Sequence, residues 1–238
     1  MASRARAYGW RPNLIAGCQL WLRGDLGITT ATGVSAWADQ SGKGNHFTQA
    51  TGANQPALVA SNIGGQPGLR FNGTSHKMAG PTGSSIFSAS SAWMYLVWRP
   101  ISVTLNVASP VYANDSIVGD NGADYGLAVR GGGNGVSAYN YTGSYANTTL
   151  QPVSNGTAYV VAWKHSASVL ACQLGQQTPQ TAASGNTVFG AAMELGSCQG
   201  IRYANMDVCE IVAGNTAISA ADEARLLKYM SGRYGVAL

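Results

Sequence analysis

The carboxylates of this chain are the side chains best suited to chemistry, but their spacing argues against catalysis. Only ten of the 238 residues are Asp or Glu, and Glu194 and Glu210 are the glutamates outside the C-terminal segment. Retaining hydrolysis of a glycoside needs an acid and a nucleophile about 5 Å apart. Asp207 and Glu210 are three residues apart, which predicts opposite faces of a regular strand. We therefore predict that the chain is not an enzyme and interpret Glu210 as a structural residue at a strand edge.

Other groups capable of acid–base or nucleophilic chemistry are scattered. His46, His76 and His165 have no nucleophile and acid arranged around them in the sequence. Ser41 does not stand in the G-x-S-x-G pattern that places a serine nucleophile between a strand and a helix. Gly42-Lys43-Gly44 lacks the spacing of a phosphate-binding loop. No catalytic residue is predicted.

Oxygen ligands suited to a hard cation gather in two regions. One region contains Asp39 and Asn45, and the other contains Asp115, Asp120 and Asp124. Ca²⁺ binds carboxylate and amide oxygens, but neither region has the twelve-residue spacing of a helix-loop-helix calcium site. Asp and Asn also form turns without a metal. We expect no cofactor, and the alternative is a calcium ion held by the second region.

Three tyrosines, Tyr139, Tyr141 and Tyr145, form a candidate binding surface. Residues 139 and 141 share one face of a predicted strand because side chains alternate between faces. Flat rings with a polar hydroxyl are suited to stacking on sugars or to filling a protein interface. Ordinary packing between neighbouring strands is the alternative. We predict that these tyrosines form a carbohydrate-binding site or an interface.

The positive charge of the chain is concentrated at its N-terminus. The formal charge is +4, and Arg4, Arg6 and Arg11 precede residue 17 with no acidic residue among them. The rest of the chain carries eleven basic and ten acidic residues. Nucleic-acid binding needs a basic surface that releases counterions, so a nearly neutral body excludes it. Residues 1–15 are expected to form a basic arm whose arginines dock on a capsid.

Short apolar runs separated by Gly, Asn, Ser or Pro predict a β protein. Charged residues make up 10% of the chain and glycine supplies 31 residues, a composition typical of many turns. Strands are expected at Gln19–Arg23, Gly68–Phe71, Trp93–Arg99, Ser116–Gly119, Tyr125–Arg130, Val136–Tyr141, Ala158–Lys164, Val169–Leu174, Thr187–Phe189 and Met206–Ala213.

Two of these runs are expected to lie at the centre of a sheet. Trp93–Trp98 and Tyr159–Trp163 are nearly continuous in apolar residues, which predicts burial on both faces. Pro100 is expected to end the first run because proline cannot donate to a ladder. One helix is expected, capped by Ser219 and stopped by Gly232 and Gly235.

Motifs at both ends of the chain carry a family resemblance. Leu20-Trp21-Leu22 is followed by W-A-D-Q-S-G-K-G-N at residues 37–45 and by Leu69-Arg70-Phe71-Asn72-Gly73. Near the C-terminus, Glu210-Ile211-Val212 leads through residues 218–223 to Arg233-Tyr234-Gly235. Together these motifs resemble laminin-G-like domains of the concanavalin A-like lectin/glucanase superfamily, of the kind found in bacteriophage virion proteins. The resemblance covers roughly residues 16–75 and 206–235.

This resemblance implies an all-β fold, a two-sheet antiparallel jelly-roll sandwich with a short C-terminal helix. Length and composition agree with one lectin-like domain over residues 16–238. No stretch approaches the roughly 18 apolar residues of a membrane span. Cys18, Cys172, Cys198 and Cys209 lack the C-x-x-C spacing of a zinc site. We expect buried thiols in a reducing compartment, and a disulfide between two of them is the alternative.

The predicted function is a non-enzymatic structural component of a bacteriophage virion, a decoration or cement protein on the capsid exterior. A glycine-rich, charge-poor composition and the lack of an apolar run after the arginines favour it, since a secreted protein carries such a signal. The chain would be made in the host cytoplasm and act on the virion surface as a homo-oligomer with major capsid or other virion proteins. The alternatives are a carbohydrate-binding module for attachment to host-surface glycans and, last, a glycan-degrading enzyme.

Overall fold

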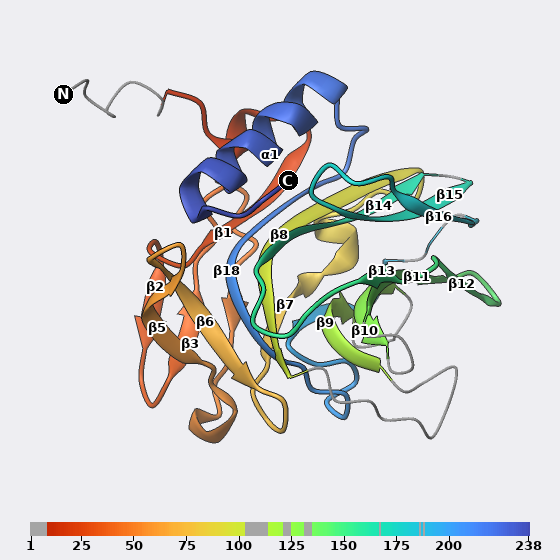
Figure 1. Cartoon of the computed structure of the whole chain (residues 1–238). Coiled ribbons are helices and arrows are strands. Elements are labelled where there is room, and N and C mark those ends of the chain that lie inside the picture. The colour runs from red at the N-terminus through yellow and green to blue at the C-terminus, as the bar shows by residue number, and fades with distance from the viewer. Residues whose placement is uncertain are drawn as a thin grey trace.

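The computed structural model of the chain describes residues 9–102, 114–120, 125–130, 135–166, 168–185, 187 and 189–238. Within these residues the strands form two antiparallel sheets, and one α-helix, α1 (Ala220–Tyr234), lies near the C-terminus (Figure 1). The expected two-layer sandwich with a C-terminal helix is thus confirmed. The described residues also contain three short 3₁₀ helices, η2 (Pro12–Leu14), η3 (Gly52–Asn54) and η4 (Gly83–Ser85).

One sheet carries the helix on its outer face. In spatial order, its described strands are β16 (Gln180–Ala183), β15 (Val169–Leu174), β14 (Tyr159–Ser166), β8 (Ser91–Ser102), β18 (Asn205–Gly214), β6 (Gln66–Asn72) and β5 (Ala57–Ile63). An eighth strand, β1 (Cys18–Arg23), pairs with the C-terminal half of β18, from Glu210 to Gly214. The two ends of the chain therefore meet in one sheet.

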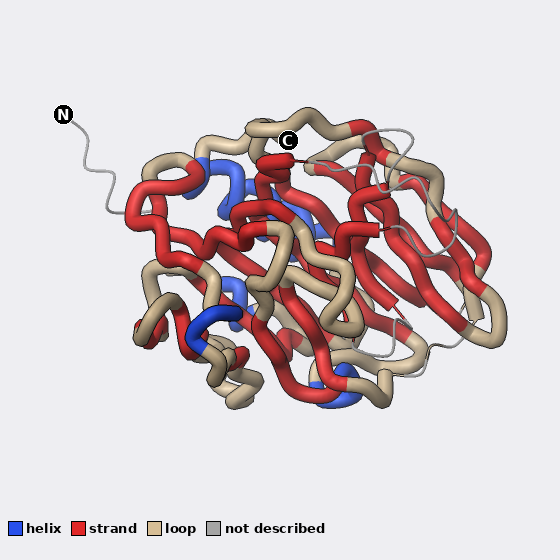
Figure 2. Tube along the Cα trace, turned by 90° about the horizontal axis from the view of Figure 1, so that it is seen from below, coloured by secondary structure: helices blue, strands red, loops and turns tan. Residues whose placement is uncertain are grey.

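The second sheet covers the other side of the core. Its described strands, in spatial order, are β12 (Tyr145–Asn147), β11 (Gly135–Tyr141), β10 (Tyr125–Arg130), β9 (Asn114–Asp120), β17 (Ala192–Leu195), β7 (Met78–Thr82), β4 (Phe47–Thr48), β3 (Val34–Trp37) and β2 (Ile28–Thr30). A short strand, β13 (Gln151–Pro152), also pairs with β11. Figure 2 shows the strands from below, with loops and turns connecting them.

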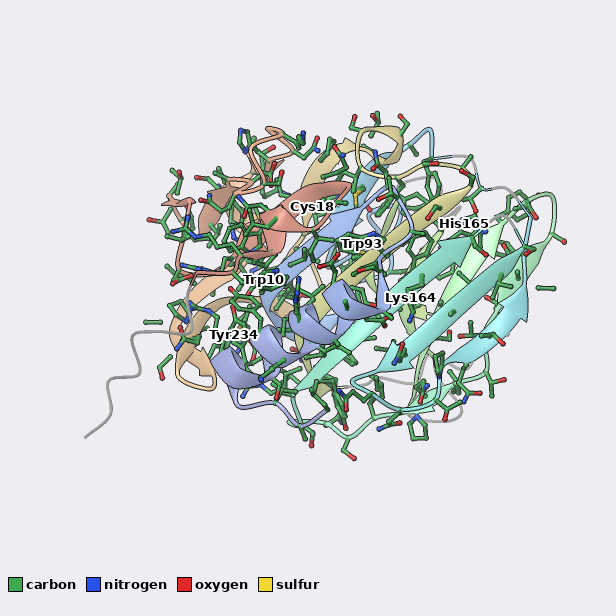
Figure 3. All side chains as sticks on the ribbon, turned by 90° about the horizontal axis from the view of Figure 1, so that it is seen from above. Trp10, Cys18, Trp93, Lys164, His165 and Tyr234 are labelled. Atoms are coloured by element: carbon green, nitrogen blue, oxygen red, sulfur yellow. The ribbon has the colours of Figure 1, made fainter. Side chains whose placement is uncertain are left out.

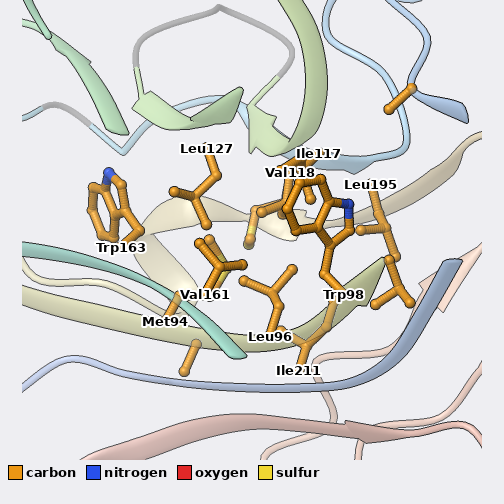
Figure 4. Packing of buried hydrophobic residues seen from close by; sticks show 14 of the residues in the cluster. Met94, Leu96, Trp98, Ile117, Val118, Leu127, Val161, Trp163, Leu195 and Ile211 are labelled. Carbon is orange, nitrogen blue, oxygen red and sulfur yellow. The ribbon is translucent and has the colours of Figure 1, made fainter. Parts of the chain in front are cut away.

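Alternation along the central strand β8 divides the apolar side chains between two cores. Met94, Leu96 and Trp98 point into the space between the sheets, where they pack with side chains of β9, β10 and β17 (Figure 4). Successive strand residues point to opposite faces, so Trp93, Tyr95 and Val97 of the same strand face α1. The prediction that this run is a central strand buried on both faces is confirmed.

The second core lies between the outer face of the sheet and α1. Leu226, Leu227, Met230 and Tyr234 of the helix are buried against it, and Ile15 joins them from the N-terminal segment. Burial of each such side chain stabilises the fold by roughly 1.5–3 kcal/mol. Ile15, which was expected to belong to the basic arm, thus packs against the domain, whereas residues 1–8 lie outside the described chain.

Helix α1 begins and ends with caps that the sequence indicates. The hydroxyl of Ser219 accepts a hydrogen bond from the backbone N–H of Asp222 at 3.1 Å, as predicted. Gly235 has a left-handed φ of 63°, a conformation that glycine adopts without the steric cost of a Cβ. The prediction that Gly232 stops the helix is wrong, because α1 continues through it to Tyr234.

Two other expectations about strands are wrong. Thr187 and Phe189 lie outside any described strand, and the strand of this region is β17, a few residues later. Pro100 does not end β8, which continues to Ser102. Pairing of β8 with β14 runs from Ser91 to Trp98 and ends before Pro100, so a residue without an N–H costs no ladder hydrogen bond on that side. The strands β2, β4, β5, β7, β12, β13 and β16 were not expected. All of them except β5 have only two to five residues, whereas β5 begins with an apolar run at residues 57–60 that the prediction missed.

The turn after β3 is organised by one buried carboxylate. Asp39, which is 8% exposed, accepts hydrogen bonds from the backbone N–H of Trp21 at 2.8 Å, of Ser41 at 2.8 Å and of Asn45 at 3.1 Å. The Ser41 hydroxyl donates to the same carboxylate at 2.6 Å. Asp39 therefore fastens the turn to β1, and its oxygens are occupied by protein donors.

All four cysteines lie in the described part of the chain as buried thiols, as predicted. Burial raises the pKa of Cys18, Cys172 and Cys209 to about 12, so these thiols stay protonated at neutral pH. Among the helices that the structure describes, none has the length and apolarity needed to cross a membrane.

Candidate functional site

The three predicted tyrosines do not form one exposed stripe. Tyr139 is only 5% exposed, whereas Tyr141 is 39% exposed at the end of β11. Tyr145 lies opposite Tyr141 in the hairpin, and their ring centroids are 4.9 Å apart. The structure therefore brings two of the three rings together at the surface and buries the third, so the predicted surface is smaller than expected.

The residues predicted to bind a cation or to dock on a capsid lie only partly within the described chain. Asp115 and Asp120 stand near the two ends of strand β9 rather than in a loop, and Asp124 lies outside the described residues. Among the described side chains, no group of three or more potential ligands gathers. Arg4 and Arg6 also lie outside the described chain, whereas Arg11 is exposed next to η2.

A pocket beside α1 combines aromatic, amide and guanidinium groups. Its cavity volume is about 390 Å³, within the range of roughly 300–1,000 Å³ of small-molecule sites. The lining residues come from the N-terminal segment, β1, two loops and the helix, and they are Trp10, Arg11, Asn13, Trp21, Arg23, Leu26, Gln40 and Tyr229. Trp10 lies near α1 in Figure 3. Segments from both ends of the chain thus build one pocket.

Two half-buried rings form the walls of this pocket. Trp10 meets Tyr229 edge to face, with ring centroids 5.9 Å apart. Trp21 is only 4% exposed, and the guanidinium of Arg23 lies 5.5 Å from its ring centroid. Trp10 and Tyr229 therefore offer the accessible aromatic surface, and Trp21 forms the floor.

The buried carboxylate of Glu210 accepts hydrogen bonds from the floor of the pocket, Trp21, and from one wall, Tyr229. Its Oε1 accepts hydrogen bonds from the Trp21 indole at 2.6 Å and the Tyr229 hydroxyl at 3.1 Å. Its Oε2 accepts one from Tyr234 at 2.8 Å. Burial, the largest influence, raises the pKa of Glu210, and these three hydrogen bonds oppose the rise only in part. Glu210 fixes the orientation of the rings without entering the pocket.

An ion-pair chain fixes the cationic side of the pocket. Asp25 accepts from Arg23 Nε at 2.6 Å and from Arg233 Nη2 at 2.7 Å. Burial alone would raise the pKa of Asp25, but the two neighbouring guanidinium groups outweigh it and hold the pKa below its usual value. The guanidinium of Arg23 is thereby held in place over Trp21.

The sequence-based view of Asp207 and Glu210 needs two corrections. A register shift between Val208 and Glu210 places an extra residue in β18. Asp207 and Glu210 consequently pair with residues 99 and 97 of β8 and share the helix-bearing face, where opposite faces were expected. Glu210 also lies inside β18, between β1 and β8, rather than at a strand edge.

Although Asp207 and Glu210 share one face, they do not form a catalytic pair, because both carboxylates are fully buried and hydrogen-bonded to neighbouring side chains. Asp207 accepts hydrogen bonds from Arg70 Nε at 2.8 Å and Arg99 Nε at 3.0 Å. Burial raises the pKa of Asp207, but these guanidinium groups outweigh it and hold the pKa below its usual range. Both carboxylates orient neighbouring side chains.

A second pocket lies on the same face, toward the start of α1. Its cavity volume is about 190 Å³, and its lining includes Trp93, Lys164, His165, Val169 and Ile218. Figure 3 shows Lys164 and His165 away from Trp10. Lys164 is already bound to Glu223 at 2.9 Å. This pocket is smaller and has fewer polar groups to offer a ligand than the pocket beside Trp10.

Searches by sequence give no relatives: no family model matches, and no curated protein matches at a significant level. Comparison with solved structures does find similar proteins. Domain 4 of AbnA, a GH43 extracellular arabinanase from Geobacillus stearothermophilus solved in complex with arabinotriose, has a TM-score of 0.66 at 12% identity. The match covers 90% of this chain and 99% of that domain.

Two further neighbours are parts of larger proteins. The binding domain of Paraclostridial Mosquitocidal Protein 1 matches with a TM-score of 0.67 and 9% identity over 96% of this chain, and this chain spans 56% of that one. The Trypanosoma rangeli sialidase in complex with the inhibitor DANA matches at 0.59 and 14% identity, over 87% of this chain and 32% of that one. These likenesses establish a lectin-like sandwich fold.

Proposed function

We propose that the chain is a non-catalytic carbohydrate-binding module and that the pocket lined by Trp10 and Tyr229 binds the sugar. The observation that carries this proposal is the composition of the pocket. Two accessible aromatic rings stand next to amide groups of Asn13 and Gln40 and the guanidinium of Arg11. The rings suit the apolar C–H face of a pyranose or furanose, and the polar groups suit its hydroxyls.

Two further observations support binding without catalysis. The lining of the pocket includes no Asp, Glu or His, so it offers no acid–base pair for glycoside cleavage. A structural neighbour, domain 4 of AbnA, was solved in complex with arabinotriose, and another is the binding domain of Paraclostridial Mosquitocidal Protein 1. One sandwich fold serves unrelated functions, so the pocket carries the argument and the neighbours lend support.

A glycan array followed by calorimetry tests this function. We expect the wild-type chain to bind at least one oligosaccharide and Trp10→Ala to weaken that binding about tenfold or more, since an aromatic contact contributes on the order of 1 kcal/mol beyond its buried area. Titration in EDTA also tests the calcium alternative, because the proposed pocket needs no metal.

The matched control is Tyr141→Ala, which removes the most exposed ring of the other candidate site. This variant should bind like the wild type. Loss of binding in Tyr141→Ala with none in Trp10→Ala would move the site to the Tyr141–Tyr145 pair. A chain that binds no glycan would contradict the proposed function.

We further propose that this module acts on the exterior of a bacteriophage particle, as a homo-oligomeric decoration or attachment protein. The charge-poor, glycine-rich composition and the basic residues Arg4, Arg6 and Arg11 support this setting. Arg4 and Arg6 would dock on a capsid or other virion protein, whereas Arg11 lines the pocket that would face host glycans. Proteomics of purified particles decides this proposal, and its failure would leave the binding function intact.

A further inference from the structure

The pocket beside Trp10 carries charge of one sign. Its lining includes two guanidinium groups, those of Arg11 and Arg23, and no carboxylate. Arg23 is neutralised in part by Asp25, which also pairs with Arg233. No acidic side chain in the described part of the chain forms an ion pair with Arg11. A nearly neutral body thus concentrates unpaired positive charge at this pocket.

The charged groups around the pocket do not cancel this charge. From β18, Glu210 faces the floor, but Trp21 and Tyr229 separate it from the cavity and its carboxylate is fully buried. From the turn after β3, Asp39 accepts from backbone donors and Ser41. A ligand in the pocket therefore meets guanidinium groups directly and carboxylates only behind other side chains.

From this arrangement we infer that the ligand is an acidic oligosaccharide, a glycan with a sugar carboxylate that pairs with Arg11. The inference rests on the proposed function and names the substrate class of that site. A planar guanidinium suits a carboxylate because two parallel N–H groups can donate to its two oxygens. The sugar ring then packs on Trp10 and Tyr229, so one ligand satisfies both the apolar and the cationic parts of the pocket.

The volume of the pocket limits how much of the glycan it holds. About 390 Å³ is at the lower end of the range for ligand sites, so the pocket accommodates a short segment of a glycan rather than a long run of sugar units. We therefore expect short acidic oligosaccharides to bind as tightly as long ones from the same polymer. An extended groove would gain affinity with each added unit.

The test compares trigalacturonic acid with its methyl-esterified form by calorimetry. These probes share one backbone and differ in the charge of the carboxyl groups. We expect the acid to bind at least tenfold more tightly, and we expect Arg11→Ala to remove most of that preference while leaving the weaker binding of the ester in place. The affinity for the acid should also fall as salt is added, because an exposed ion pair is screened.

Arg225→Ala is the matched control, because it removes a guanidinium that is largely exposed on α1 and is not among the pocket residues. It should keep the preference for the acid. Equal binding of acid and ester, or an unchanged preference in Arg11→Ala, would overturn the inference and leave the proposed function standing. If neither probe binds while the array finds a neutral glycan, the acidic class is wrong. Binding of no glycan at all overturns both.

Discussion

Replacing Asp39 by alanine is expected to lower the free energy of unfolding by about 3–5 kcal/mol. The carboxylate accepts backbone hydrogen bonds from Trp21, Ser41 and Asn45, and a buried donor left without an acceptor costs roughly 1–3 kcal/mol. Urea denaturation followed by tryptophan fluorescence measures the loss. Because the turn is fastened to β1, a destabilised corner would also loosen the strand that carries Trp21.

Ser41→Ala provides the graded control for this result. It removes the hydroxyl that donates to Asp39 and accepts from the backbone N–H of Lys43, and it leaves the carboxylate and its backbone partners in place. A loss of about 1–2 kcal/mol is expected, because Lys43 is exposed and its N–H can bond to water instead. If Asp39→Ala were no more destabilising than Ser41→Ala, the carboxylate would not organise the turn as the hydrogen bonds indicate.

Glu210→Ala is the second substitution with a large expected effect, a loss of about 3–5 kcal/mol. It creates a cavity between β18 and α1 and removes the acceptor for Trp21, Tyr229 and Tyr234. Glu210→Gln keeps the volume and one acceptor oxygen, so it should remain within about 1 kcal/mol of the wild type. Equal losses in both variants would show that the charge, rather than the shape and the acceptor, is what matters.

The raised pKa of Glu210 determines how the stability of the wild type, compared with that of Glu210→Gln, depends on pH. A carboxyl whose folded-state pKa lies above its unfolded value, 4.5, stabilises the fold fully below that value and less as the pH rises through the folded-state pKa. Relative to Glu210→Gln, the wild type should therefore lose stability from pH 4 toward neutral pH. Denaturation curves at several pH values measure this, and the opposite slope would contradict a raised pKa.

The fold could be expected from the sequence because its main signals are local. Nearly continuous apolar runs mark β8 and β14, and the Ser219 cap with Gly235 marks α1. Local signals do not reveal the register shift at Cys209 and Glu210, which reverses the expected faces of Asp207 and Glu210. Short strands such as β4 form through pairing with strands that are far away in the sequence, so their own residues do not predict them.

The pocket could not be expected from the sequence for a related reason. Trp10 and Tyr229 are separated by more than two hundred residues and meet only because β1 pairs with β18 and α1 lies across that sheet. One signal was available in Leu20-Trp21-Leu22, where alternation places Trp21 on the face opposite the two leucines. The binding role predicted for Tyr139, Tyr141 and Tyr145 stays a prediction; the sequence did not show that Tyr139 is buried while Tyr141 is exposed.

The most direct test of the account is to record ¹H–¹⁵N NMR spectra during titration with the oligosaccharide that the array binds best. The indole signals of Trp10 and Trp21 report on the proposed pocket, and those of Trp98 and Trp163 report on the core between the sheets. We predict shifts at Trp10 and Trp21 and none at the two core indoles. Shifts confined to residues around Tyr141 and Tyr145, with Trp10 and Trp21 unchanged, would contradict the assignment of this pocket as the sugar-binding site.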